Sequence, residues 1–409
     1  MSKLCISLPP FAPDYSGAAS ALFDMGGMIV IHDASGCTGN YTGYDEPRWL
    51  GSETAVYCSA LRHMDAVLGN DEKVIGKIVK AAEELKPKFI AILGSPVPMV
   101  IGTDFAGIAN EIECITGIPA IGLSTRGLAY YGKGIADATI ALMKKFVKGK
   151  KDVLSGAINL LGITPLDFHI NGNNEDFRRL FEENGIKVLA SYSMGMKLEE
   201  MQDSIGAQLN VVVSQAGIAV AKYMKQKYKI PYVTVTPMGD GIVALEKVKA
   251  TLADCEKSGA FVNVPESGKV NETPEICSNN TVGDKYCNPS SILIAGEQVI
   301  CNSMREYLQK KYNVGAITVA GLFDMSQEHM QPGDIDVKNE KHLREVLNSG
   351  QYQVIVGDPM IWELIREEQA EHIKFYEWPH VALSSKVHWN DYKRFLSEET
   401  ELFLKNVAE

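Results

Sequence analysis

The sequence lacks the common signatures of nucleotide binding and of several hydrolase classes. Its 409 residues contain no GxxxxGK[ST] phosphate loop and no GxGxxG dinucleotide fingerprint. Neither a G-x-S-x-G nucleophile elbow nor an HExxH zinc motif occurs. We therefore expect no P-loop ATPase, no bound dinucleotide and no serine or zinc hydrolase chemistry on this chain.

Long apolar runs and a positive charge balance are also missing. No stretch approaches the roughly 18 apolar residues of a membrane span, and the opening MSKLCISLPPF has no charged-then-apolar secretory pattern. The formal net charge is -11 and the pI is about 5.4, which disfavours binding to phosphate backbones. We expect a cytoplasmic protein with neither a membrane nor nucleic acid as a partner.

The eight cysteines are spread along the chain without a CxxC pair or a compact zinc pattern. In a reducing cytoplasm they are not a disulfide framework. A metal site would have to be assembled from cysteines that are distant in sequence; the alternative is that each is a small buried apolar residue. They are Cys5, Cys37, Cys58, Cys114, Cys255, Cys277, Cys287 and Cys301.

Short apolar runs alternate with amphipathic stretches from Met28–His32 to Ile373–Tyr376. This order is typical of parallel sheets with helices on both faces. Runs such as FIAILG and SILIAG are apolar throughout, as strands buried on both faces require. The pattern predicts an α/β protein made of three Rossmann-like, doubly wound parallel-sheet domains.

Two changes in composition suggest where these domains meet. One is the basic run KKFVKGKK at 144–151, and the other is the polar, Pro- and Gly-rich stretch at 263–291. We expect a helix from about Asn390 to Val407 to pack back across the first domain. The predicted division is an N-terminal domain at 1–150, a second domain at 151–265, a polar loop at 266–290, a third domain at 291–389 and a C-terminal helix at 390–409.

The most informative segment ends in a glycine–cysteine turn. PDYSGAASALFDMGGMIVIHDASGC runs through a predicted strand and stops at Cys37. A residue at the carboxyl end of a parallel strand faces the crevice where α/β proteins bind ligands. Gly36 allows the backbone to approach a bulky cofactor closely.

Three segments in this region resemble the nitrogenase component 1 superfamily. They are HDASGC (32–37), DAVLGN (65–70) and LGSPVPMVIGTDF (93–105), in the order and at the spacing that the family shows. The resemblance implies a subunit of a nitrogenase-like oxidoreductase with an interface iron–sulfur cluster. It argues against a true dinitrogenase, because the ligands of that enzyme's larger cofactor do not match.

The same resemblance implies the cluster ligands. The family uses three cysteines per subunit, and Cys37 matches the central one, whereas the other two positions fall near Pro13 and at Ser95. Cys58, just before DAVLGN, is the second candidate metal ligand, with a structural buried cysteine as the alternative. Two chains on a two-fold axis would supply the four thiolates of a [4Fe–4S] cluster; a homologous sister subunit is the other source of the missing thiolates.

Several polar residues near these cysteines are further candidates. Asp33, Gly36 and Ser95 are predicted to border the cofactor, although Ser95 also suits a helix N-cap. His32 and His63 are candidate proton donors, and their alternatives are a bond to a buried carbonyl and a salt-bridged surface position.

A second cofactor would have Cys277 and His380 as its nearest ligand candidates, although their flanking residues do not match the family.

The implied function is reduction of a substrate with electrons from a separate P-loop iron–sulfur ATPase, in an anaerobic setting. A second component 1-like subunit, identical or homologous, is the other implied partner. A non-catalytic scaffold for metallocluster assembly is the alternative, and a cluster-free ligand-binding protein is a third possibility. The sequence does not select a substrate.

Overall fold

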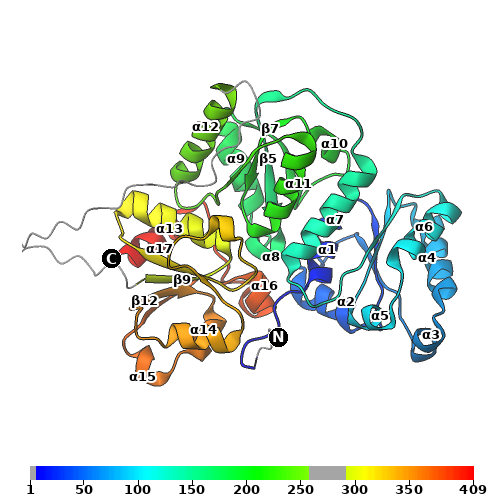
Figure 1. Cartoon of the computed structure of the whole chain (residues 1–409), viewed down its shortest axis with the longest axis horizontal. Coiled ribbons are helices and arrows are strands. Elements are labelled where there is room, and N and C mark those ends of the chain that lie inside the picture. Colours follow the sequence, from blue (N-terminus) through cyan, green and yellow to red (C-terminus); the bar gives the residue numbers. More distant parts are fainter. Residues whose placement is uncertain (1–5, 258–291) are drawn as a thin grey trace, which may run out of the picture.

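The computed structural model describes residues 6–257 and 292–409, which form three parallel sheets with helices around each (Figure 1). The predicted fold class is therefore confirmed. We call each sheet with its helices the first, second and third unit; the predicted domain boundaries stay a prediction. Cys5, Cys277, Cys287 and the predicted polar loop at 266–290 lie outside the described residues.

The first unit has the strand order β2-β1-β3-β4. Its strands β1 and β3 read MIVI and IAIL and are buried along their whole length, because helices cover both faces of the sheet. Its elements are β1 (Met28–Ile31), β2 (Ala55–Cys58), β3 (Ile90–Leu93), β4 (Ala120–Leu123), α1 (Asp14–Leu22), α2 (Gly36–Asn40), the π-helix η1 (Tyr41–Asp45), α3 (His63–Leu68), α4 (Asp71–Leu85), α5 (Pro96–Ile101), α6 (Phe105–Thr116) and α7 (Tyr131–Phe146).

The second unit follows the same plan, with the strand order β6-β5-β7-β8. Its elements are β5 (Leu154–Ile163), β6 (Lys187–Ser193), β7 (Ala207–Val212), β8 (Tyr232–Thr234), α8 (Pro165–Phe168), α9 (Asn173–Glu183), α10 (Glu200–Ser204), η2 (Gln215–Gly217), α11 (Ile218–Tyr228) and α12 (Ile242–Lys257).

The third unit has the strand order β11-β10-β9-β12-β13. Its elements are β9 (Ile292–Gly296), β10 (Ile317–Gly321), β11 (Ile335–Asp336), β12 (Val354–Gly357), β13 (Lys374–Glu377), α13 (Gln298–Tyr312), η3 (Gln327–His329), α14 (Glu340–Leu347), η4 (Pro359–Leu364), α15 (Glu367–Ala370), α16 (Val381–Ser384), η5 (Ser385–His388) and α17 (Glu398–Ala408).

Helices α1 and α7 touch each other closely because each carries a glycine at the crossing. A Cβ added at Gly17 would lie 2.0 Å from the carbonyl oxygen of Tyr131, and one at Gly134 would lie 1.7 Å from that of Asp14. No residue with a side chain fits at either position without separating the helices. The contact fixes α7, whose other side packs on η2 and α11 of the second unit.

The C-terminal helix begins later than the sequence suggested and packs elsewhere. Ser397 caps α17 by accepting the N–H of Thr400 at 3.1 Å, and the buried Phe395 just before it donates its N–H to Asn173. Helix α17 packs on α13 of the third unit rather than across the first unit (Figure 1).

Among the described residues, no helix has the length and apolar character needed to span a membrane.

Candidate metal centre

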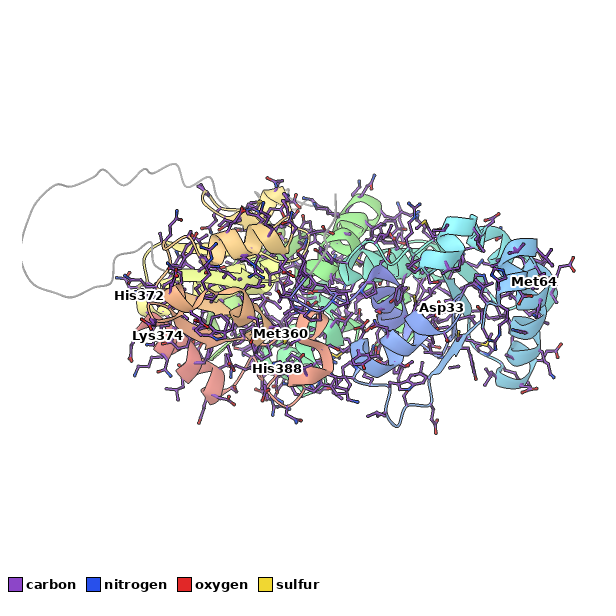
Figure 2. The ribbon with its side chains drawn as sticks, turned by 90° about the horizontal axis from the view of Figure 1, so that it is seen from below. Asp33, Met64, Met360, His372, Lys374 and His388 are labelled. Atoms are coloured by element: carbon purple, nitrogen blue, oxygen red, sulfur yellow. The ribbon has the colours of Figure 1, made fainter. Side chains whose placement is uncertain are left out.

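Cys37 and Cys58 lie at the same edge of the first sheet. Cys58 is the last residue of β2 and pairs in register with Ile31, the last residue of β1. Cys37 follows β1 in the first turn of α2. Both side chains are partly exposed. The structure therefore brings the two predicted ligands to the ends of neighbouring strands, in the unit where Asp33 and Met64 are labelled in Figure 2.

Asp33 shapes the loop that carries Cys37. Its Oδ2 atom accepts the N–H groups of Ser35, Cys37 and Thr38 at 2.9, 2.8 and 3.2 Å. Its carbonyl oxygen lies 3.3 Å from the Cys58 thiol, which can donate to it. The carboxylate thus holds the ligand loop through the backbone, and the residue links the two cysteines. Its predicted contact with a cofactor stays a prediction.

Two hydroxyl groups approach the Cys37 thiol. The side chains of Tyr15 and Ser95 hydrogen-bond to it and favour its thiolate form, while burial, followed by the charge of Asp33, raises the pKa of Cys37. Burial also raises the pKa of Tyr15 far above its usual value, so this hydroxyl remains a donor. Tyr15 was not predicted; the only signal was its place two residues after Pro13.

Ser95 and Gly36 were both predicted to border the cofactor. Ser95 occupies the N-cap position of α5 but does not cap it, because its Oγ donates to the carbonyl of His32 at 2.9 Å. No atom lies within 4 Å of a Cβ added at Gly36. The space above this part of the loop is therefore open.

The two candidate proton donors have different surroundings. His32 is buried, and its Nδ1 atom lies 2.8 Å from the Oγ of Ser59. Burial lowers its pKa, so the ring is neutral near pH 7. The His32 ring thus hydrogen-bonds to the hydroxyl of Ser59 and not to a buried carbonyl, which was the alternative given for it. His63 is exposed at the start of α3 and forms no ion pair with the described residues.

One chain does not hold a complete metal site in the part that the structure describes. No group of three or more His, Cys, Asp or Glu side chains in residues 6–257 and 292–409 is arranged to bind a metal ion. The two thiols at the edge of the first sheet would be half of the four ligands that a [4Fe–4S] cluster takes. The donor set fits such a cluster only if another subunit completes it.

Exposed apolar side chains lie on the two helices that follow strands β2 and β3 of this sheet. They come from α3, which follows β2, and from α5, which follows β3. Val100 is 77% exposed, Leu68 69% and Val67 66%. Exposed apolar side chains on helices that leave one edge of a sheet suit a protein interface. We call this surface the apolar rim; it comprises Met64, Val67, Leu68, Val97, Val100 and Ile101.

The candidate second-cofactor ligands are not brought together among the described residues, since Cys277 lies outside them. His380 is buried where the three units meet, and its Nε2 atom lies 3.0 Å from Oδ1 of Asp167. Cys301 is buried in the core, in agreement with the alternative reading of the cysteines as small buried apolar residues.

Comparison with known proteins identifies the family. Residues 13–371 match the family of nitrogenase component 1 type oxidoreductases. The chain belongs to this family. The resemblance that the three motifs carried is therefore confirmed.

Relatives in this family include reductase subunits and a biosynthesis protein. The chain is 29% identical over 254 residues to the nitrogenase iron-molybdenum cofactor biosynthesis protein NifE of Clostridium pasteurianum, covering 59% of this chain and 54% of that protein. It is 28% identical over 327 residues to the nitrogenase molybdenum-iron protein alpha chain of the same organism, covering 76% and 59%. It is 24% identical over 181 residues to a light-independent protochlorophyllide reductase polypeptide of Crocosphaera subtropica, covering 42% and 36%. The chain thus spans between about a third and three fifths of the length of these relatives.

Among solved structures, the chain resembles one described as nitrogenase Cp1 at pH 5. The TM-score is 0.67 with 16% identity, and the match covers 99% of this chain and 89% of that one. At this identity the likeness bears on the fold alone, and it agrees with the three-unit α/β architecture.

Proposed function

We propose that this protein is a subunit of a nitrogenase-like oxidoreductase in which Cys37 and Cys58 hold part of an iron–sulfur cluster at a subunit interface. The partner is a second component 1-like subunit, and a copy of the same chain would complete a four-thiolate set. The observation that carries the proposal is the pair of partly exposed thiols at neighbouring strand ends, together with the apolar rim.

When bound, such a cluster supplies a low-potential one-electron relay. The protein contributes the two thiolates and the hydroxyl of Tyr15, which donates to Cys37, with the Ser95 hydroxyl close to the same thiol. It also contributes the Asp33 turn, which fixes the ligand loop. Because the chain has no phosphate loop, electrons would come from a separate P-loop iron–sulfur ATPase, and the substrate would bind in the cleft between the units.

The direct test is the iron and sulfide content of anoxically purified protein. We expect iron in the wild-type protein and its loss, by more than half, in both Cys37→Ser and Cys58→Ser. Cys114→Ser is the matched control, because Cys114 is an exposed cysteine on α6. Iron content that is the same in all four proteins would remove the site assignment.

A cluster-assembly scaffold is the second candidate function, and the similarity to NifE favours it. Such a protein would keep the interface cluster without turning over a substrate. The two functions are separated by adding the purified reductase ATPase and a reductant. Steady consumption of reducing equivalents with a small unsaturated substrate indicates an enzyme, whereas transfer of iron to an apo acceptor protein without turnover indicates a scaffold.

A further inference from the structure

The backbone before α1 crosses from the third unit to the first (Figure 1). Residues 6–12 form no helix or strand, and we call them the strap. Oε2 of Glu340, the first residue of α14, accepts the N–H groups of residues 6–8 at 2.6, 3.0 and 3.1 Å. A hydrogen bond to an ionised acceptor is roughly twice as strong as one between neutral groups. One carboxylate of the third unit therefore holds this end of the strap.

The surroundings of Glu340 support this contact. Glu340 is buried, and Arg344, one turn later, lies 3.5 Å from its Oε1 atom and donates to the Ser7 hydroxyl at 3.0 Å. Burial opposes ionisation of Glu340, but the N–H groups of the strap and Arg344 outweigh it and lower the pKa, so the group is charged at neutral pH. The side chain of Ile6 is 91% exposed. Polar bonds therefore hold the strap at residues 6 and 7.

Further along, the strap touches both the first and the third unit. The ring of Phe11 lies 5.8 Å from that of Tyr130, which immediately precedes α7, and 5.3 Å from that of Phe323, which follows β10. The rings of Tyr130 and Phe323 are themselves 5.5 Å apart. Leu8 is buried, and with Phe11 it lines a cavity of only about 20 Å³. The apolar side chains of the strap thus pack closely between the two units.

Backbone hydrogen bonds fix Ala12 between the same two units. Its N–H donates to the carbonyl of Ala382, in α16 of the third unit, at 2.8 Å, and its carbonyl accepts the N–H of Tyr131, in α7, at 3.0 Å. The strap is therefore bonded to the third unit at Glu340 and Ala382, and to the first unit at Tyr131. Moving the third unit away from α7 breaks at least one of these attachments.

Tyr130 and Phe323 also line a cleft of about 350 Å³. Its walls come from α7, from η2 with α11, and from residues 323–326. The wall formed by α7 is held to the second unit, because the hydroxyl of Tyr131 donates to Asp167 at 2.5 Å. The wall formed by 323–326 belongs to the third unit, so widening of the cleft requires that this unit move away from α7.

We propose that the strap is a latch that holds the third unit against α7 and keeps the cleft narrow, and that its release from Glu340 lets the cleft widen. The strap suits this role because it has no regular structure and one end is held by polar bonds that water can replace. A small molecule that binds only the widened cleft favours release of the strap, and release favours its binding by the same factor. The inference goes beyond the proposed function and does not depend on a metal centre.

Hydrogen exchange of the anoxically purified protein, followed by mass spectrometry, tests the latch. The amide of Tyr131 reports the strap, because it donates to Ala12. The amide of Gln215 reports the cleft, because it donates to Glu297 of the third unit at 2.8 Å. We expect Glu340→Gln to speed exchange at both amides by about tenfold or more, because the strap loses its charged acceptor.

Glu345→Gln is the matched control for this variant. Glu345 lies on the same helix, is exposed and contacts Lys341 at 3.9 Å, so the same substitution there should leave both amides as in wild type. Faster exchange in Glu340→Gln that is confined to α14 would overturn the proposal, because Glu340 would then serve its own helix.

Phe11→Ala tests the coupling between the strap and the cleft. It removes the ring contacts with the two cleft residues but keeps the bonds to Glu340, and we expect faster exchange at Gln215 here too. Exchange within α4 is the reference for global opening, and all rates are compared with it. Exchange at Gln215 that equals wild type in both strap variants would overturn the proposal, even with a loosened strap. These rates do not depend on iron content, so they succeed or fail separately from the assignment of the cluster ligands.

Discussion

Tyr15 stands beside Cys37 with a hydroxyl that burial keeps protonated, so it donates to the sulfur whether or not a metal is bound. Hydrogen bonds to a ligating sulfur withdraw negative charge from a cluster and make its reduction easier. The residue therefore acts on the properties of the proposed centre without being a ligand.

We expect Tyr15→Phe to retain iron but to shift the reduction potential of the centre to a more negative value, because one hydrogen bond to sulfur is lost. An anoxic redox titration followed by electron paramagnetic resonance measures the shift. Tyr192→Phe is the control. A potential equal to that of wild type would show that Tyr15 only packs against the loop.

A second prediction at the residue scale concerns Asp45 and the pH dependence of stability. It is buried, its Oδ2 accepts from Ser16 at 2.6 Å and Asn40 at 2.8 Å, and burial is the largest cause that raises its pKa to about 7. A raised pKa in the folded state adds stability at low pH that is lost as the pH rises from about 4 to about 7.

Asp45→Asn should therefore flatten the dependence of unfolding free energy on pH between about 4 and about 7. The difference across the full range is at most about 4 kcal/mol at 1.36 kcal/mol per pKa unit. Asparagine keeps one oxygen for both donors, so the bonds can survive. Urea unfolding at several pH values measures the effect; parallel curves for the two proteins would contradict it.

Part of the candidate site was predictable from the sequence. Cys37 follows a strand that its apolar run identifies, so its place at the sheet edge follows from local pattern, and the family resemblance pointed to Ser95. The approach of Tyr15 to the Cys37 thiol depends on how α1 packs, which no local pattern encodes. The junction of Tyr131 with Asp167 likewise joins two units and has no sequence signal.

At the scale of elements, strands with continuous apolar runs were predicted well, and so was the edge strand β13, which corresponds to the predicted run Ile373–Tyr376, whereas the edge strand β2 was not. The runs around β1, β3 and β9 correspond to fully or largely buried strands. Strand β2 reads AVYC, lies at the sheet edge and is only partly buried, so it lacks the run that marks a central strand. The predicted start of the last helix was wrong because Ser397 provides the cap.

The crossing of α1 and α7 gives a prediction for one element pair. Gly134→Ala should destabilise the protein by about 3 kcal/mol, because the new methyl group overlaps the carbonyl of Asp14. Gly132→Ala on the same helix is the control, since its Cβ would meet nothing closer than 3.6 Å. Thermal or urea unfolding measures both. Equal stability of the two variants would mean that the helices separate at no cost.

At the scale of the whole molecule, the apolar rim predicts self-association or pairing with a related subunit. We expect Val100→Asp and Leu68→Asp each to weaken that association at least tenfold, because a charge would be buried against an apolar surface. Leu402→Asp is the control, at an exposed leucine on α17 that is 58% exposed. Analytical ultracentrifugation of anoxic protein measures the change, and association that is unaffected in both rim variants would place the interface elsewhere.

The glycine-mediated crossing also limits how the molecule can move. Because α7 is locked to α1 and also packs on η2 and α11, the first two units are tied into a single body. A cleft of about 350 Å³ is lined by α7, by α11 and by residues 323–326, and only the last of these belong to the third unit. Widening of this cleft to admit or release a small molecule would therefore have to displace residues 323–326 and not the wall that carries Tyr131.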